Sequence, residues 1–167
     1  MPLILRKETP ADYSAIQMVT AEAFRQATHT SGTEHLIIAA LRDAGELTIS
    51  LVAEKAGSIV GHVAISPVRI SDGTPGWYGL GPIAVAPEWQ KQGIGSALVA
   101  KALEDLRSSG AAGCVVLGEP EFYERFGFVT AHSLILPNVP PEYFQIINWQ
   151  NKEPKGSVTF HGAFSVE

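Results

Sequence analysis

The sequence predicts an α/β protein, an α+β arrangement built on one mixed sheet, and three observations carry that prediction. Residues 47–86 alternate apolar and polar side chains with the period of two that is typical of an antiparallel meander. Residues 93–109 then show helical periodicity. Residues 114–117 form a short, wholly apolar run of the kind buried in parallel pairs, so an antiparallel meander and a parallel strand share the sheet.

The segment before the meander predicts one strand and two helices. Leu3–Arg6 is a short strand, and 9–12 (Thr-Pro-Ala-Asp) combine a hydroxyl N-cap, a proline at the first helical position and an acid at the third. The helix that starts there should stop near 28–32, with its apolar face carried by Ile16, Val19, Ala23 and Phe24. A second helix is expected over His35–Arg42, closed at Gly45.

The meander itself divides into three strands, Leu47–Lys55, Ser58–Ile70 and Trp77–Ala86. The first two join at Ala56-Gly57, and the turn 72–76 leads into the third. The helix Gly93–Ser109 should pack on the sheet by one face, because its apolar positions form one arc, namely Leu98, Val99, Ala102, Leu103 and Leu106.

Beyond this helix the pattern weakens. Cys114–Leu117 is the parallel strand, and Glu119–Phe126 is a short helix ended by Gly127. The prolines at 137, 140 and 141 predict an irregular tail until Ser157–Val166, which has strand character.

Composition sets the class of protein. With 167 residues, 46% hydrophobic and 17% charged, the chain should form one globular domain over 1–167. The net charge of −5 argues against nucleic acid as a partner. A single cysteine suits a reducing compartment, and no apolar run is long enough for a signal peptide or a membrane helix. We therefore expect a cytoplasmic protein without a membrane partner; the oligomeric state stays open, a homodimer included.

The residues most informative for function lie at 80–98, where a strand passes into a helix through a polar turn with two glycines. Unpaired N–H groups at a helix start and the positive end of the helix dipole together attract anions. Gly93 and Gly95 leave room for a ligand, and Gln90, Lys91 and Ser96 offer further donors. The turn therefore predicts a phosphate or pyrophosphate site. The alternative is that both glycines serve only a tight turn.

Two other phosphate motifs fit poorly. A P-loop requires Lys and then Ser or Thr directly after its last glycine, but Ser96-Ala97 follow Gly95. A dinucleotide fingerprint placed on 79–84 would run into a strand instead of opening a helix. Placed at Gly93, it would put its third small residue at Leu98.

Two motifs resemble the GNAT superfamily of acyl-CoA N-acyltransferases. The Gln-x-x-Gly-x-Gly pattern at 90–95 follows the strand 82–85 and a Pro-Glu-Trp step, and is similar to the cofactor motif of that family. The segment 122–128 (Phe-Tyr-Glu-Arg-Phe-Gly-Phe) is similar to its aromatic-Tyr-x-x-x-Gly-Phe segment. The resemblance covers about Leu3–Phe128. It implies a strongly twisted mixed sheet with helices on both faces.

The resemblance also implies acetyl-CoA as cosubstrate. The turn would hold the pyrophosphate through its amides, at Gln90, Lys91, Gln92, Gly93, Ile94, Gly95 and Ser96. The strand residues Ile83, Ala84 and Val85 would pair with the pantetheine arm, and one N–H there would face the thioester carbonyl. A bulge at Gly79 or Gly81 would open a wedge for the acetyl group.

The implied reaction is direct transfer of an acetyl group to a primary amine of a small molecule or peptide. Tyr123 matches the family's proton donor to the leaving thiolate, although a core aromatic is the alternative. The base is open among Glu34, Glu119, His62, His29 and water, or the amine arrives neutral. Cys114 is predicted to be a core residue and not a nucleophile. The five histidines lack the spacing of metal ligands, so no metal is expected.

The acceptor should enter beside residues 24–41 and 137–149. The alternative function is a non-catalytic coenzyme A-binding or regulatory module, favoured by the lack of an acid between Trp77 and Ala86. A nucleotide-dependent oxidoreductase ranks third.

Overall fold

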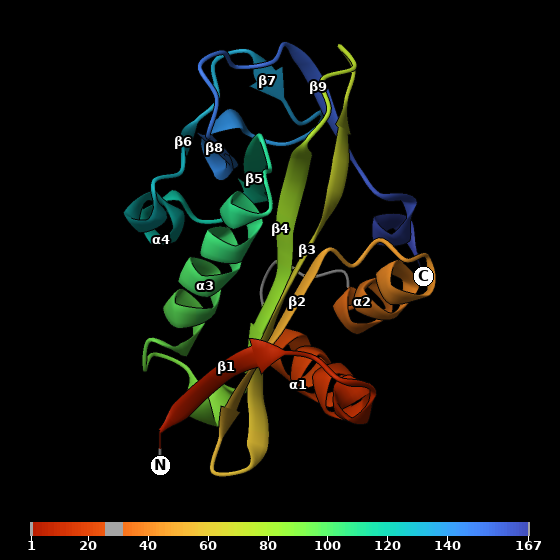
Figure 1. The fold of residues 1–167 in the computed structure, drawn as a ribbon, viewed down its shortest axis with the longest axis vertical. Helices are drawn as coiled ribbons and strands as arrows, with labels where there is room; N and C mark the ends of the chain where they lie inside the picture. Colours follow the sequence, from red (N-terminus) through yellow and green to blue (C-terminus); the bar gives the residue numbers. More distant parts are fainter. Residues whose placement is uncertain (1, 26–31, 167) are drawn as a thin grey trace.

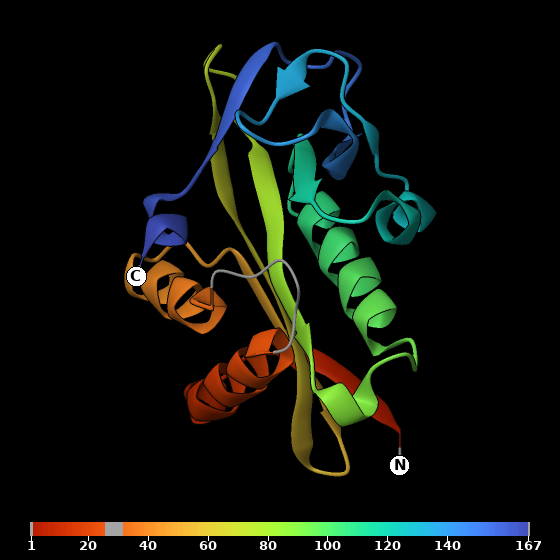
Figure 2. The ribbon, with the colours of Figure 1, turned by 180° about the vertical axis from the view of Figure 1, so that it is seen from behind.

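The computed structural model describes residues 2–25 and 32–166, and its centre is a nine-stranded mixed sheet. Two helices cover one face of the sheet and one long helix covers the other (Figures 1 and 2). The principal elements in chain order are β1 (Leu3–Lys7), α1 (Tyr13–Arg25), α2 (Glu34–Asp43), β2 (Ile49–Lys55), β3 (Ser58–Ile70), β4 (Trp77–Val85), α3 (Ile94–Ser108), β5 (Gly113–Leu117), α4 (Pro120–Tyr123), β6 (Val129–Thr130), β7 (Leu134–Ile135), β8 (Phe144–Asn148) and β9 (Gly156–Phe160).

The sheet confirms the predicted mixture of pairings. Its main path runs β1-β2-β3-β4-β5-β8-β6, and β9 pairs with both β3 and β7. The strands β2, β3 and β4 form the antiparallel meander, and β4 pairs with β5 in parallel. The crossover between these two parallel strands is α3, as the change of periodicity predicts.

The first predicted helix begins as a 3-10 turn. Pro10–Asp12 form that turn, and α1 continues directly from it. The Asp12 carboxylate accepts the Thr9 N–H at 2.7 Å and two hydrogen bonds from Arg6 at 2.8 and 3.0 Å. This contact ties the start of α1 to β1. The predicted end of the helix, near 28–32, lies largely outside the described residues.

The prediction of an irregular tail is wrong. β8 pairs antiparallel with β5 over its whole length and joins β6 to the sheet. Its first three residues are buried regardless of which face they point to, so β8 lacks the alternation that marks a half-exposed strand. The predicted strand 157–166 is also too long: β9 ends at Phe160, and Gly162–Ser165 form a 3-10 turn that packs on α2.

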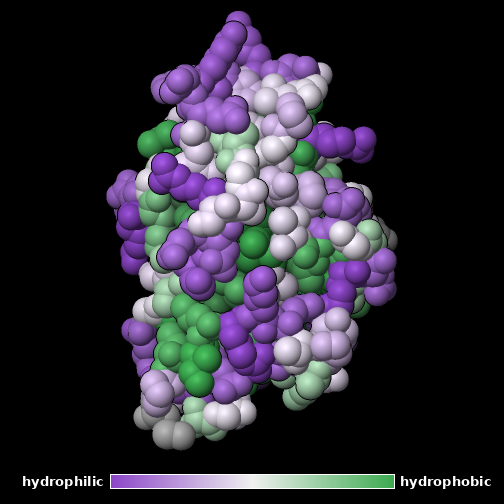
Figure 3. Space-filling model, viewed as in Figure 1, coloured by the Kyte–Doolittle hydropathy of each residue, from purple (hydrophilic) through white to green (hydrophobic). Residues whose placement is uncertain are grey.

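The core lies on both faces of the sheet. The α3 face buries Leu98, Val99 and Leu106 of the helix against β2, β3 and β4. The opposite face packs Ile16 of α1 and Ile38 of α2 on Val52 and neighbouring residues of the sheet. On the face seen in Figure 3, apolar side chains appear among mainly polar ones, and a prominent green group lies at the lower left. Across the described residues, no helix has the length and apolarity to cross a membrane.

Candidate functional site

The strands β4 and β5 separate in the middle of the sheet. They pair only from Trp77 with Gly113 to Leu80 with Val116. Beyond that point β4 continues along β3 alone, and the β3–β4 register shifts between Val63 and Ile65. The predicted bulge therefore lies at Gly81, which has a φ of 136°, whereas Gly79 stays in register with Ser66. The result is a free strand edge over the second half of β4.

Along the second half of β4, the main-chain N–H and C=O groups of successive residues point alternately to β3 and to this free edge. The Ala86 N–H donates to the Val60 carbonyl at 2.8 Å, so by the alternation of a strand Ala84 also directs its main chain toward β3. Ile83 and Val85 direct theirs to the free edge. The Val85 carbonyl accepts a hydrogen bond from Gln90 Nε2 at 2.9 Å, which ties the following turn to that edge.

The turn between β4 and α3 uses two left-handed residues, Lys91 (φ 63°) and Gly93 (φ 84°). The first intrahelical hydrogen bond of α3 is donated by the Ala97 N–H to the Gly93 carbonyl at 3.0 Å. The N–H groups of residues 94–96 precede it and have no acceptor within the helix. Three free amides at the positive end of a helix dipole are a suitable environment for an anion. The side chain of Gln92 turns back, and its Nε2 donates to the Glu88 carbonyl at 3.4 Å.

Gly95 is the point where β4, α3 and α4 meet. A Cβ atom at this position would lie 3.7 Å from Val85 Cγ2, 3.9 Å from Ile83 Cδ1 and 4.0 Å from Phe122 Cζ. The two motifs that lie about 30 residues apart in the sequence are therefore neighbours in the fold. Any side chain larger than that of alanine here would reach into the space between the free edge and α4.

Arg125 is a site residue that the sequence reasoning missed. Its Nη1 donates to Ser96 Oγ at 3.4 Å, and its guanidinium carbon lies 4.9 Å from the centre of the Phe122 ring. The cation is thus held beside the free amides at the start of α3, where it adds to their attraction for an anion. The sequence signal that could have identified Arg125 is its position as a basic residue within the second motif.

Tyr123 is a packed aromatic with a buried phenol. The residue is 8% exposed, and its ring makes edge contacts with Phe122 and Phe128 at centroid distances of 4.9 and 5.7 Å. Gly118 is required beside it, because a Cβ there would lie 2.6 Å from the ring. Burial raises the pKa of Tyr123 to about 12, so the phenol is protonated at neutral pH.

The candidate bases are scattered. Glu34 is the first residue of α2, and Glu119 is exposed before α4. His29 lies outside the described residues. His62 is fully buried on β3, opposite Ala84, and burial lowers the pKa of its ring to about 4 against an opposing effect of Glu8. The structure thus places one candidate, His62, directly beside the strand of the free edge.

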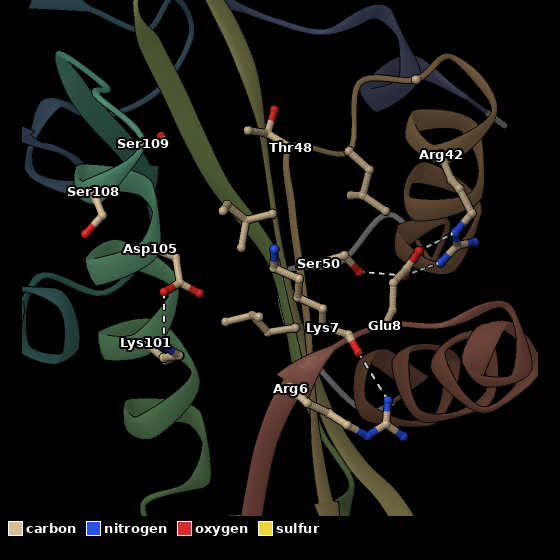
Figure 4. A pocket seen from close by; sticks show the side chains of 14 residues that line it. Arg6, Lys7, Glu8, Arg42, Thr48, Ser50, Lys101, Asp105, Ser108 and Ser109 are labelled. Atoms are coloured by element: carbon tan, nitrogen blue, oxygen red, sulfur yellow. Dashed lines mark hydrogen bonds and ion pairs between the residues drawn. The ribbon is translucent and has the colours of Figure 1, made fainter.

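A groove of about 900 Å³ lies at the other edge of the sheet, between β2 and the second half of α3 (Figure 4). Lys101 and Asp105 line it from α3, and Glu8 and Ser50 line it from the end of β1 and from β2. It is separated from the free edge of β4 by β3. The groove is therefore distinct from the cofactor motif.

The remaining reactive side chains of the described residues do not form a site. Cys114 is buried and burial raises the pKa of its thiol, which disfavours the nucleophilic thiolate. Within residues 2–25 and 32–166, no three His, Cys, Asp or Glu side chains group closely enough to hold a metal ion.

Comparison with known proteins shows the family. The pattern described as an acetyltransferase (GNAT) domain matches residues 46–130, about half of the chain. The Escherichia coli protein YhbS, an uncharacterised N-acetyltransferase, is 35% identical over 130 residues, which cover 77% of this chain and 75% of that protein. YjhQ from the same organism is 32% identical over 121 residues, covering 71% and 65%. The chain belongs to the GNAT acetyltransferase family.

Solved structures agree with this assignment. A GNAT acetyltransferase from Brucella melitensis in complex with acetyl-CoA has a TM-score of 0.88 and 43% identity, with 98% of each chain covered. Escherichia coli YhbS in complex with CoA has a TM-score of 0.87 and 32% identity, covering 98% of this chain and 92% of the other. The expected mixed α/β fold of the family is confirmed.

Proposed function

We propose that this protein is an N-acetyltransferase that transfers an acetyl group from acetyl-CoA directly to a primary amine of a small molecule or peptide. The observation that carries the proposal is the meeting at Gly95 of a free β4 edge, unpaired helix amides and the second motif. The Brucella melitensis relative in complex with acetyl-CoA and the YhbS complex with CoA support the choice of cosubstrate.

Different groups of the protein suit different parts of acetyl-CoA. The amides of residues 94–96, with Arg125 and Lys91 nearby, suit the pyrophosphate, because charge-assisted hydrogen bonds and the helix dipole act on the same group. The main-chain groups of Ile83 and Val85 suit the amides of the pantetheine arm, which would add to β4 like a short strand. Gln90 would then release the Val85 carbonyl.

The protein would promote this reaction mainly by positioning the amine and the thioester, without a covalent intermediate on a protein side chain. The lone pair of a neutral amine forms the new C–N bond to the thioester carbon, and the carbonyl electrons move to its oxygen. An N–H on the free edge of β4 would stabilise that oxyanion. Collapse of the adduct breaks the C–S bond, and the coenzyme A thiolate leaves toward the Tyr123 phenol.

The test is binding followed by turnover. Isothermal titration should show binding of coenzyme A and acetyl-CoA but not of NAD or ATP, and thiol release from acetyl-CoA should rise with some member of a panel of primary amines. Gly95→Val should weaken coenzyme A binding at least about tenfold, a loss of about 1.4 kcal/mol, because its side chain enters the space beside β4. Gly162→Ala, where a Cβ meets no atom within 4 Å, is the control.

Each result decides between functions. Binding of coenzyme A without thiol release for any amine would favour the non-catalytic coenzyme A-binding module, which the lack of a carboxylate on β4 also favours. Binding of NAD with no response to coenzyme A would contradict both readings and favour an oxidoreductase.

A further inference from the structure

A chain of hydrogen bonds runs from the groove into the sheet beside β4. The Glu8 carboxylate accepts two bonds from Arg42, at 2.7 and 2.9 Å, and one from Ser50 Oγ at 2.6 Å (Figure 4). Ser50 Oγ in turn lies 2.7 Å from His62 Nε2. Neither motif of the cofactor site contains any of these residues.

The direction of each hydrogen bond follows from the chemistry of the groups. An ionised carboxylate only accepts, so the single proton of the Ser50 hydroxyl points to Glu8. Ser50 Oγ must then accept from His62, and the proton of the neutral ring is on Nε2. His62 Nδ1 therefore carries a lone pair, and this buried atom has no hydrogen-bond partner among the described residues.

His62 lies on β3, between the strand of Ser50 and the strand of the proposed reaction. The two nitrogens of an imidazole point in nearly opposite directions, and Nε2 points toward β2, where Ser50 lies. Nδ1 accordingly points away from Ser50, and Ala84 of β4, which is paired with His62, presents only a methyl group. The free edge that would hold the thioester belongs to the same short stretch of β4.

Two more buried polar atoms have no hydrogen-bond partner in the part of the chain that the structure describes, Thr20 Oγ1 of α1 and Ser66 Oγ of β3. Ser66 shares the sheet face of His62, because the two are four residues apart on one strand. Buried polar groups are nearly always hydrogen-bonded, and ordered solvent satisfies those that protein groups do not reach. The face under α1 is therefore suited to hold water beside His62 Nδ1.

We propose that His62 is the proton acceptor of the acetyl transfer, reached through a water molecule, and that Ser50 and Glu8 are positioning residues that hold its Nδ1 lone pair free. The inference rests on the proposed function. When the amine has bonded to the thioester carbon, its nitrogen carries an extra proton, which passes through the water to Nδ1. The C–S bond then breaks and the thiolate leaves. The imidazolium returns its proton to solvent after the product departs.

The charges around the ring act on its protonation in opposite directions. Glu8 favours the imidazolium that forms, while Arg42 of α2, which also stacks 3.8 Å from the centre of the Tyr13 ring, opposes it. Burial lowers the pKa of the ring to about 4, so at neutral pH the lone pair is free. The nitrogen of the tetrahedral adduct is a much stronger acid than a free ammonium, so a weak base can accept its proton.

The first test is the tautomer. Nitrogen-15 NMR of the labelled wild type at pH 7 should show His62 protonated at Nε2 and not at Nδ1. Ser50→Ala should lose this preference, whereas Ser108→Ala, an exposed serine of the same groove, should keep it. A wild-type ring protonated at Nδ1 would overturn the proposal whatever the activity.

The second test is His62→Gln, whose amide can still donate to Ser50 but offers no basic nitrogen. We expect the coenzyme A dissociation constant to stay within about threefold of wild type by calorimetry, and thiol release with the primary-amine panel to fall by on the order of 100-fold at pH 7. A variant that keeps more than a third of the wild-type rate overturns the role of His62. A wild type that binds coenzyme A but releases no thiol overturns the proposed function itself, and this inference with it.

Discussion

Replacing Tyr123 by phenylalanine tests how the leaving thiolate is stabilised. The phenol, with its pKa near 12, is a weaker acid than a thiol of pKa about 8.5 by roughly 3.5 units, so complete proton transfer would be uphill by about 5 kcal/mol. The tyrosine should therefore act as a hydrogen-bond donor to the thiolate. A hydrogen bond to a charged group contributes about 1.5–3 kcal/mol, which corresponds to a fall in kcat of roughly ten- to 150-fold.

The assay is thiol release from acetyl-CoA with an accepted amine, measured between pH 6 and 10. Tyr123→Phe keeps the ring contacts with Phe122 and Phe128, so the melting temperature and the KM for acetyl-CoA should change little. Because burial raises the pKa of the phenol, the wild type should show no loss of rate from its ionisation at pH 10. Tyr143→Phe, at 38% exposure, is the control. An unchanged kcat, or a fall above about a thousandfold, would refute the reasoning.

Three further predictions follow from single contacts. Gly118→Ala should lower kcat more than coenzyme A affinity, because its Cβ would lie 2.6 Å from the Tyr123 ring, and Gly162→Ala should change neither in the same kinetic assay. Arg125→Ala should weaken coenzyme A binding about three- to tenfold in low-salt calorimetry and less at high salt, because an exposed charge is screened; equal losses at both salt concentrations would contradict this. Asp12→Asn should cost about 2–3 kcal/mol in urea unfolding. The guanidinium of Arg6 holds the Asp12 pKa below its usual range, so this contribution is present above about pH 4 and lost below it; a variant as stable as wild type at pH 7 would refute the assignment.

Local patterns were enough to predict the main elements as far as α4 and the glycine turn between β4 and α3. The apolar arc of α3 and the alternation of residues 47–51 at the start of β2 depend only on the periodicity of the backbone, which neighbouring residues reveal. The need for glycine at 93 is also local, because its φ of 84° suits few other residues.

The sequence pattern did not predict the strand β8, because burial on both faces removes the alternation of apolar and polar residues. The strand β8 is covered on both faces by distant parts of the chain, so its sequence does not distinguish inside from outside. The prolines before it suggested an irregular tail, yet they end before the strand begins.

The sequence by itself determined the order of elements as far as α4, the glycine turn and the two motifs of the family. Only the tertiary structure decided that Arg125 lies beside Ser96, 29 residues away, and that His62 meets Ser50 while Ser50 meets Glu8, 42 residues away. The physical reason is that periodicity is a property of neighbours along the chain. The tautomer of His62, the raised pKa of Tyr123 and the free edge of β4 depend on what packs against them across the sheet.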